Sequence, residues 1–258
     1  MQLATWNVNS LKVRLPHVLQ WLVNQPVDVL CLQELKMTND KFPQAAIAAA
    51  GYQSFFIGQK TYNGVALLVK EGCQVDQVSI LRNNPHFPDD QKRLIAATID
   101  DIRVMCGYFP NGQAVGSEKF IYKLAWLDAL HAWVQQELQH YPQFALLGDF
   151  NIAPDDRDVH DPAAWEGQVH VSPAERSHLK ALQSLGLHDA FRAHHSEAGF
   201  YSWWDYRMAA YRRNMGLRID HIYLSHSPLQ RCTACVIDKT PRGWEQPSDH
   251  TPVIATLT

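Results

Sequence analysis

Carboxylates, carboxamides, a tyrosine and histidines stand where the apolar runs of this sequence end. A hard divalent cation such as Mg²⁺ binds one or two carboxylates, amide oxygens and retained waters. Glu34, Asp149 and Asp249 can offer carboxylates to such an ion. Asn7 can add an amide oxygen. The side chains at these run ends are Asn7, Asn9, Gln33, Glu34, Tyr108, Asp149, Asn151, Asp220, His221, Asp249 and His250.

Asp220 is informative because it lies within the otherwise apolar run LRIDHIYL. A buried acid in such a run needs a cation or a proton donor beside it. His250 is the candidate partner, since a carboxylate that bonds an imidazole orients the ring and stabilises its charged form, as in catalytic triads. The other residues also have plainer interpretations, with Asn7 and Asn9 as turn formers and Glu34 as a solvated strand end.

The composition indicates one large folded core. The chain has 258 residues, of which 46% are hydrophobic and 19% are charged, and this balance is typical of globular proteins. Its net charge of −3 lacks the basic excess of many non-specific nucleic-acid binders. A polyanionic partner would therefore need a local basic face or a bound cation.

The sequence has no signal-peptide pattern and no apolar run long enough to cross a membrane. Its five cysteines form an odd, scattered set, which favours a reducing compartment. Cys232 and Cys235 form a CxxC in a β-like run, but no second such pair exists, so we interpret them as half-buried thiols. We expect a cytoplasmic monomer without a membrane partner.

Strand-length apolar runs alternate with helical patterns along the whole chain, without a linker or a shift in composition. We therefore predict a single domain over residues 1–258. Several runs are apolar on both faces, which suits strands covered on each side and favours two packed sheets with a site at their shared rim. The predicted helices are Pro16 to Asn24, Gln44 to Ala50, Ser117 to His140 and Pro173 to Leu185.

Aromatic residues and arginines alternate in FYSWWDYR, from Phe200 to Arg207. Such a mixture is suited to stacking on bases or sugars together with phosphate contact. The loop from Pro154 to Val171 holds several aspartates but lacks the glycine and glutamate spacing of an EF-hand. Within it we expect His160 and His170 to be exposed to solvent.

Seven motifs in order resemble the exonuclease III family of AP endonucleases, within the endonuclease/exonuclease/phosphatase superfamily. They are TWNVNSL, LQELK, GYFPNG, LLGDFNIAP, SWWDYR, LRIDHIYLS and PSDHTPV, and they span the chain. The resemblance implies an α/β fold, namely a four-layered α/β sandwich of two packed mixed β-sheets flanked by helices. It also implies a metal-dependent site, with Mg²⁺ as the cofactor and Mn²⁺ able to substitute.

The resemblance assigns a role to each residue at the run ends. Glu34 is expected to be the principal metal ligand, and Asp149 to orient or deprotonate the attacking water. Asp220 is expected to orient His250, which stabilises the charge on phosphorus. The expected catalytic residues are Tyr108, Asp149, Asn151, Asp220 and His250. The residues expected around the metal are Asn7, Glu34, Asp149, Asn151, Asp249 and His250.

The resemblance also implies a substrate surface for duplex DNA with abasic sites or blocked 3′ ends. Trp203, Trp204 and Leu217 are expected to line a pocket for a flipped abasic sugar, and Arg207 to insert into or brace the duplex. Asn9 supports the site in this scheme, and Asn111 contacts the substrate. The loop NGQAVGSEK after Pro110 lacks the arginine that relatives present there, and Leu217 replaces an aromatic residue.

Three alternatives remain open at this point. The protein could be a specialised 3′-exonuclease or 3′-phosphatase with little abasic-site incision, and the loop from Trp165 to His170 would decide this by blocking or opening the pocket. It could also act on lipid or inositol phosphates within the same superfamily, although SWWDYR and LRIDHI favour the DNA-repair branch. An inactive DNA-binding scaffold is disfavoured because Glu34, Asp149 and His250 are all present.

Overall fold

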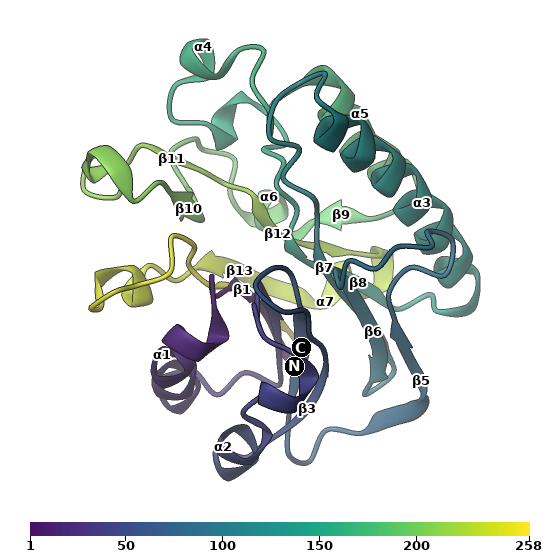
Figure 1. Ribbon diagram of the computed structural model, residues 1–258. Coiled ribbons are helices and arrows are strands. Elements are labelled where there is room, and N and C mark those ends of the chain that lie inside the picture. Colours follow the sequence, from purple (N-terminus) through teal and green to yellow (C-terminus); the bar gives the residue numbers. More distant parts are fainter.

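Two six-stranded sheets face each other and helices cover both outer faces (Figure 1). The computed structural model describes residues 1–258. The predicted four-layered sandwich of two mixed sheets is confirmed. No helix is both long and apolar enough to span a membrane.

The first sheet is antiparallel except for one parallel pair, β1 with β2. Across the sheet its strands are β13 (Cys232–Ile237), β14 (Val253–Leu257), β1 (Gln2–Asn7), β2 (Val29–Gln33), β4 (Val65–Lys70) and β3 (Tyr52–Ile57).

The second sheet also has one parallel pair, β7 with β8. Across the sheet its strands are β5 (Val75–Arg82), β6 (Leu94–Ile99), β7 (Ile102–Tyr108), β8 (Phe144–Asp149), β12 (Asp220–Leu224) and β9 (His188–Asp189). A separate two-stranded ribbon consists of β10 (Trp203–Trp204) and β11 (Gly216–Leu217).

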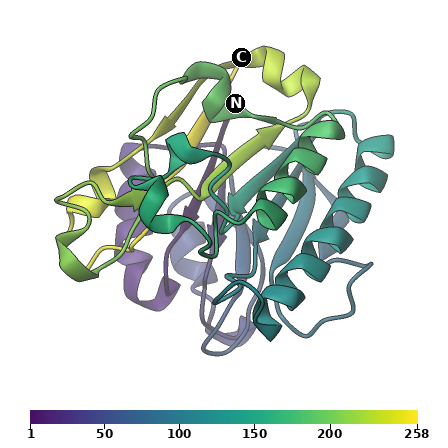
Figure 2. The ribbon, with the colours of Figure 1, turned by 90° about the horizontal axis from the view of Figure 1, so that it is seen from above.

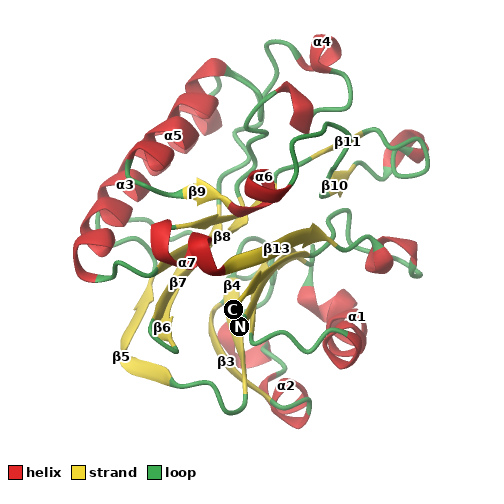
Figure 3. Ribbon diagram, turned by 180° about the vertical axis from the view of Figure 1, so that it is seen from behind, coloured by secondary structure: helices red, strands yellow, loops and turns green.

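Four helices form the outer layers, two on each sheet, and Figure 2 shows the two long helices of the second sheet side by side. Shorter helices lie in the connections, as the view from behind shows (Figure 3). The first sheet is covered by α1 (Leu11–Asn24) and α2 (Gln44–Ala49), and the second by α3 (Glu118–His140) and α5 (Pro173–Ser184). The short helices are α4 (Pro162–Trp165), α6 (Ala190–His194) and α7 (His226–Arg231), with single turns η1 (Asn39–Lys41), η2 (Asp156–Asp158), η3 (Arg207–Ala209) and η4 (Thr240–Gly243).

The two long helices of the second sheet start at capping signals in the sequence. The Ser117 hydroxyl accepts a hydrogen bond from the backbone of Phe120 at the start of α3, and Ser172 with Glu175 forms a capping box at the start of α5. The predicted start of α1 at Pro16 is wrong, because the helix begins at Leu11, whose side chain is buried in the core, and it keeps Pro16 inside.

Three apolar layers hold the sandwich together. Between the sheets, Leu3 and Val29 pack with Leu147 and its neighbours, while the next residue in β1, Ala4, faces α1 on the outside. Alternate residues of one strand therefore serve different layers, which explains why the runs are apolar on both faces. Tryptophans 21, 126 and 133 fill the outer layers and are almost fully buried.

Strand register brings the predicted site residues to one rim. In the second sheet, Asp149 pairs with Tyr108 on one side and with Asp220 on the other. In the first sheet, the parallel strands β1 and β2 end together at Asn7 and Gln33. Because both sheets present these ends to the same side, polar groups far apart in the sequence meet there.

Gly148 allows the β7–β8 pair to place Asp149. A Cβ atom at Gly148 would lie 1.8 Å from the backbone oxygen of Gly107, so any side chain there forces the two strands apart. We expect Gly148→Ala to lower the free energy of unfolding by on the order of 3 kcal/mol. Gly51→Ala is the matched control, since Gly51 is left-handed but faces open space, and it should cost about 1 kcal/mol. Urea unfolding measures both, and equal losses would contradict the steric argument.

Candidate active site

Glu34, Asp149 and His250 converge at the rim, with their ligand atoms all within 4.8 Å of one another. Glu34 follows β2, Asp149 ends β8, and His250 precedes β14, so both sheets contribute. Glu34 has a left-handed backbone, with φ of 55°, a conformation that costs energy outside glycine and often occurs at functional sites. Asp149 and His250 are buried, while Glu34 is half-buried.

Asn7 joins the two carboxylates of this group. Its amide nitrogen lies 2.8 Å from Glu34 Oε1 and 2.8 Å from Asp149 Oδ2, and its oxygen accepts a hydrogen bond from the backbone of Asn9. Lys36 lies 2.9 Å from the other oxygen of Glu34. In this structure the amide nitrogen of Asn7 donates to both carboxylates, and the expected contact of its oxygen with a metal stays a prediction.

His250 is held by Asp220 as the sequence indicated. Its Nδ1 lies 2.8 Å from Asp220 Oδ2, and its Nε2 lies 3.7 Å from Asp149 Oδ2. Burial alone would lower the pKa of His250, but Asp220 and Asp149 outweigh it and raise that pKa to about 10. In the metal-free protein the ring therefore carries a positive charge beside Asp149, and the predicted contact of His250 with a metal stays a prediction.

Asp149 is a carboxylate whose protonation changes near neutral pH. Burial raises its pKa to about 7, and the charge of His250 opposes this shift. Its Oδ1 accepts a hydrogen bond from the Asn151 backbone at 2.9 Å. A carboxyl group with such a pKa can take up a proton at neutral pH.

Tyr108, Asn111 and Asn151 border this centre. The Asn151 amide donates to the backbone oxygen of Phe109 at 3.0 Å, and its Oδ1 lies 3.4 Å from the Asn111 amide nitrogen. Burial raises the pKa of Tyr108 well above its usual value, so its phenol stays protonated. The guanidinium of Arg93 covers one face of the Tyr108 ring at 4.8 Å.

Asp249 stands apart from the three converging residues. Its carboxylate accepts hydrogen bonds from Asn9 at 2.9 Å and from the Trp203 indole at 2.9 Å. It lies outside the group formed by Glu34, Asp149 and His250, and its expected role as a metal ligand stays a prediction. The indole of Trp203 engages one of its oxygens and the amide of Asn9 the other, so Asp249 also fixes the position of these neighbours.

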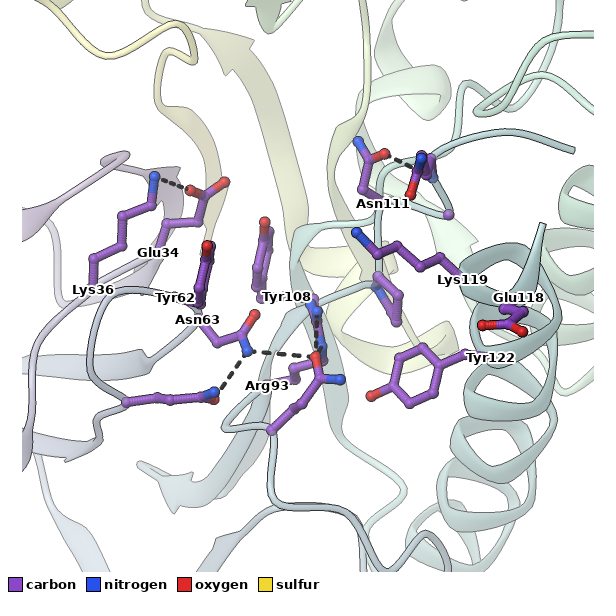
Figure 4. Close-up of a pocket in the computed structure, with 15 residues that line it drawn as sticks. Glu34, Lys36, Tyr62, Asn63, Arg93, Tyr108, Asn111, Glu118, Lys119 and Tyr122 are labelled. Carbon is purple, nitrogen blue, oxygen red and sulfur yellow. Dashed lines mark hydrogen bonds and ion pairs between the residues drawn. The ribbon is translucent and has the colours of Figure 1, made fainter.

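The open space beside the centre lies on the side of Glu34 and Tyr108. A cavity of about 700 Å³ is bordered there by both residues and by Asn111 (Figure 4). Lys36, Arg93 and Lys119 also line it, and they provide positive charge next to the carboxylates. This cavity has room for several groups of a nucleic-acid strand.

Two of the three residues expected to line an abasic-sugar pocket are fully buried. Trp204 and Leu217 are both 0% exposed. Trp204 packs against Tyr201 and Ala210, and Leu217 belongs to a small apolar cluster that includes Val159 and the half-buried Trp203. Both side chains are covered by neighbouring segments in this structure, and their predicted contact with substrate stays a prediction.

Arg207 lies at an exposed loop, as its expected contact with the duplex requires. Its side chain is 84% exposed and its guanidinium bonds the Asp205 carboxylate, with Nη2 2.6 Å from Oδ2. The next residues, Met208 and Ala209, both have positive φ. The loop therefore turns tightly after Arg207, and the guanidinium of Arg207 forms an ion pair with Asp205 within the same loop.

His170 and Lys123 are site residues that the sequence analysis missed. His170 is only 8% exposed, contrary to the expectation of exposure, and its Nδ1 lies 2.6 Å from the backbone oxygen of Asn151. Burial and then the charge of Lys123 lower the pKa of His170 to about 4. The available signals were the valines on both sides of His170 and the spacing of Lys123 from Phe120 and Trp126 on one helix face.

Comparison with known proteins identifies the family. Residues 4–250 match the Endonuclease/Exonuclease/phosphatase family. The chain belongs to this family. Exodeoxyribonuclease III of Haemophilus influenzae is 35% identical over 269 aligned positions, which cover 99% of this chain and 99% of that protein. The predicted resemblance and the predicted class, a DNA phosphodiester hydrolase, are confirmed.

Solved structures of the same size agree closely with this one. The 3′ phosphatase NExo from Neisseria, bound to a product DNA hairpin, has a TM-score of 0.97 and 44% identity, over 100% of this chain and 99% of that chain. An AP endonuclease from Archaeoglobus fulgidus has a TM-score of 0.95 and 36% identity, over 100% of this chain and 99% of that chain.

The family is metal-dependent, and the donors at this rim fit a divalent cation. Two carboxylates, Glu34 and Asp149, both lie against the single amide of Asn7, and buried like charges need positive charge between them. Oxygen ligands of this kind suit a hard ion. Such an ion, when bound, polarises the phosphate and lowers the pKa of water. Glu34 and Asp149 would hold it.

We expect Glu34→Gln to weaken metal binding more than folding. A neutral amide keeps the shape of the side chain but removes one of the two carboxylate charges that attract the ion. A titration of hydrolysis with Mg²⁺ should shift to higher concentrations, while the unfolding midpoint in EDTA stays close to that of wild type. An unchanged Mg²⁺ titration would show that Glu34 is not a ligand.

We expect Asp149→Asn to lose turnover by several orders of magnitude and to gain stability in metal-free protein at pH 8. The folded-state pKa of Asp149, about 7, lies above the ordinary value of 3.8. Its burial therefore costs stability progressively as the pH rises from about 4 to about 7. Urea unfolding in EDTA should show a difference from wild type at pH 8 that is small at pH 4. A constant difference would contradict the raised pKa.

Proposed function

We propose that this protein is a monomeric, Mg²⁺-dependent hydrolase that processes 3′ ends of duplex DNA, removing 3′-phosphates and 3′-terminal nucleotides, with little incision at abasic sites. The observation that carries this proposal is the packing on one side of the site. Trp204 and Leu217 are fully buried, and His170 lies against Asn151. In this proposal a flipped abasic sugar would enter on this side, whereas a strand end would not.

The distribution of space supports the same preference. His170 Nε2 lies 3.5 Å from the amide nitrogen of Asn111, and the ring of Trp165 lies 6.2 Å from that of His170. The loop from Trp165 to His170 therefore closes the side away from Glu34. Room remains on the Glu34 side, in the cavity of about 700 Å³. A terminal phosphate needs only the open side, and no base has to leave the stack.

The arrangement of side chains accounts for the chemistry. We assign to Asp149 the role of orienting the attacking water, because its carboxylate lies at the rim within reach of Asn7, Asn151 and His250. His250, held by Asp220, places positive charge beside the phosphate oxygens. Asn151 and Tyr108 donate hydrogen bonds to the phosphate in this scheme. Glu34 and Asp149 hold the Mg²⁺.

The names of similar proteins add support. NExo from Neisseria, at 44 to 45% identity, is described as a 3′ phosphatase and a 3′-5′ exonuclease. The Archaeoglobus protein, an AP endonuclease, is 36% identical. All five cysteines are free thiols, which is compatible with the cytoplasm as the proposed location. We also retain the proposal that residues 1–258 are one domain, since one apolar layer joins the two sheets.

The first experiment compares two labelled duplexes, one with a 3′-phosphate at a nick and one with an internal stable abasic analogue, each with Mg²⁺ or EDTA. We expect Mg²⁺-dependent removal of the 3′-phosphate and slow incision at the analogue. Fast incision at the analogue would make the protein a general abasic endonuclease. Activity on neither duplex would overturn the proposal and favour the lipid-phosphate or inactive-scaffold alternatives.

We expect His170→Ser to increase abasic-site incision relative to 3′-phosphate removal by about tenfold, because the smaller side chain opens space beside Asn151. The control is His160→Ser in the same segment, where the imidazole bonds the backbone of Gly216 instead of a site residue. This control should leave the ratio unchanged. An unchanged ratio in His170→Ser would show that this side chain does not close the pocket.

A further inference from the structure

A buried ammonium lies directly beneath the site. Lys123, on α3, is 0% exposed. Its Nζ lies 2.5 Å from Glu175 Oε1, 2.7 Å from the backbone oxygen of Asn151 and 3.2 Å from that of Asn111. An ammonium has three hydrogens to donate, so these three acceptors satisfy it completely. Two of them belong to residues that border the phosphate position.

Glu175 connects the same point to the loop that closes the site. Its carboxylate accepts hydrogen bonds from the backbone of His170 at 3.0 Å and from the Ser172 hydroxyl at 2.6 Å. It lies at the start of α5, next to α3 in Figure 2. The ion pair therefore ties two helices to three loop positions.

The backbone at Asn151 needs such support. Its φ is 51°, in the left-handed region that side chains other than glycine adopt at a cost. Its carbonyl receives hydrogen bonds from both Lys123 and His170, which fix the direction of this peptide. The Asn111 turn is braced in a similar way, since its Oδ1 accepts the backbone hydrogen of Gln113. The two asparagine side chains meet above the ammonium, 3.4 Å apart.

We propose that Lys123 is a positioning residue, whose ammonium, paired with Glu175, holds the backbone of Asn111 and Asn151 so that their amides face the substrate phosphate. The role rests on the proposed function. Stability alone does not explain why this buried ion pair is present, because such a pair can often be replaced by apolar groups of equal volume without loss of stability. An apolar replacement, however, leaves both carbonyls without their shared donor, and their peptides are then free to rotate.

The test uses the double variant Lys123→Met with Glu175→Gln, which removes both charges and keeps both volumes, so that no unpaired carboxylate is left to unfold the protein. The matched control is Arg103→Met with Glu137→Gln. That pair is also buried, with Nε 2.5 Å from Oε2, and Arg103 also bonds a backbone carbonyl, that of Ser79 on β5, away from the site. Both double variants are purified in parallel with wild type, and their thermal midpoints are compared.

On the duplex with a 3′-phosphate and at saturating Mg²⁺, we expect kcat of the Lys123 variant to fall by about a hundredfold, with KM within about threefold of wild type. The control should keep the wild-type kcat even if its thermal midpoint falls by a similar amount. A Lys123 variant with wild-type kcat, or a control with an equal loss, would overturn the positioning role.

Hydrogen exchange separates this inference from the proposed function. If wild type fails to remove the 3′-phosphate, the proposed function is wrong, and exchange then decides the positioning role without any substrate. Amides of residues 108–113 and 149–153 should exchange faster in the Lys123 variant than in wild type or in the control. Unchanged exchange in these segments would overturn the proposal.

Discussion

Two carboxylates from different sheets, Glu34 and Asp149, are held close together at the rim, and their mutual repulsion shapes the surroundings. The amide of Asn7 donates to both of them. His250 approaches Asp149 from one side and Lys36 approaches Glu34 from the other. Each of these groups stands at a strand end or turn, so the balance of charge depends on the packing of the two sheets, on the register of β7 with β8 and on the left-handed turn at Glu34. A divalent ion bound from the solvent side would offset the same repulsion between the two carboxylates.

The parts of the site that could be read from the sequence share a physical signal, a polar residue in or just after an apolar run. Asp220 within LRIDHIYL indicated a buried partner, and His250 lies 2.8 Å away. The fold was equally visible, because strands that are apolar on both faces need two neighbouring layers. The covering of Trp204 and Leu217 was not visible, since it depends on segments distant in sequence that fold over them. The indole that engages Asp249 was hidden for the same reason, whereas the valines on both sides of His170 were a local signal of its burial.

Helix α3 carries buried charge near both ends, with Lys123 beneath the site and Glu137 at the far end of the second sheet. Both charges are paired, one with Glu175 and the other with Arg103. Their surroundings differ in one respect that matters for function. Arg103 reaches the carbonyl of Ser79, on β5, whereas Lys123 reaches the turns that follow β7 and β8. A buried ion pair therefore anchors the edge of the second sheet at one end of α3 and the turns of the candidate active site at the other.

The pairing of Arg207 with Asp205 affects how the protein meets a polyanion. Nucleic-acid binding usually gains free energy from the counterions that phosphates release when they meet free cationic side chains. Arg207 already has a carboxylate partner on the same exposed turn, so contact with a phosphate exchanges one anionic partner for another. Such an exchange adds little to the number of ions released. A duplex contact at this turn, as predicted for Arg207, would therefore be less sensitive to ionic strength than one made by a free arginine.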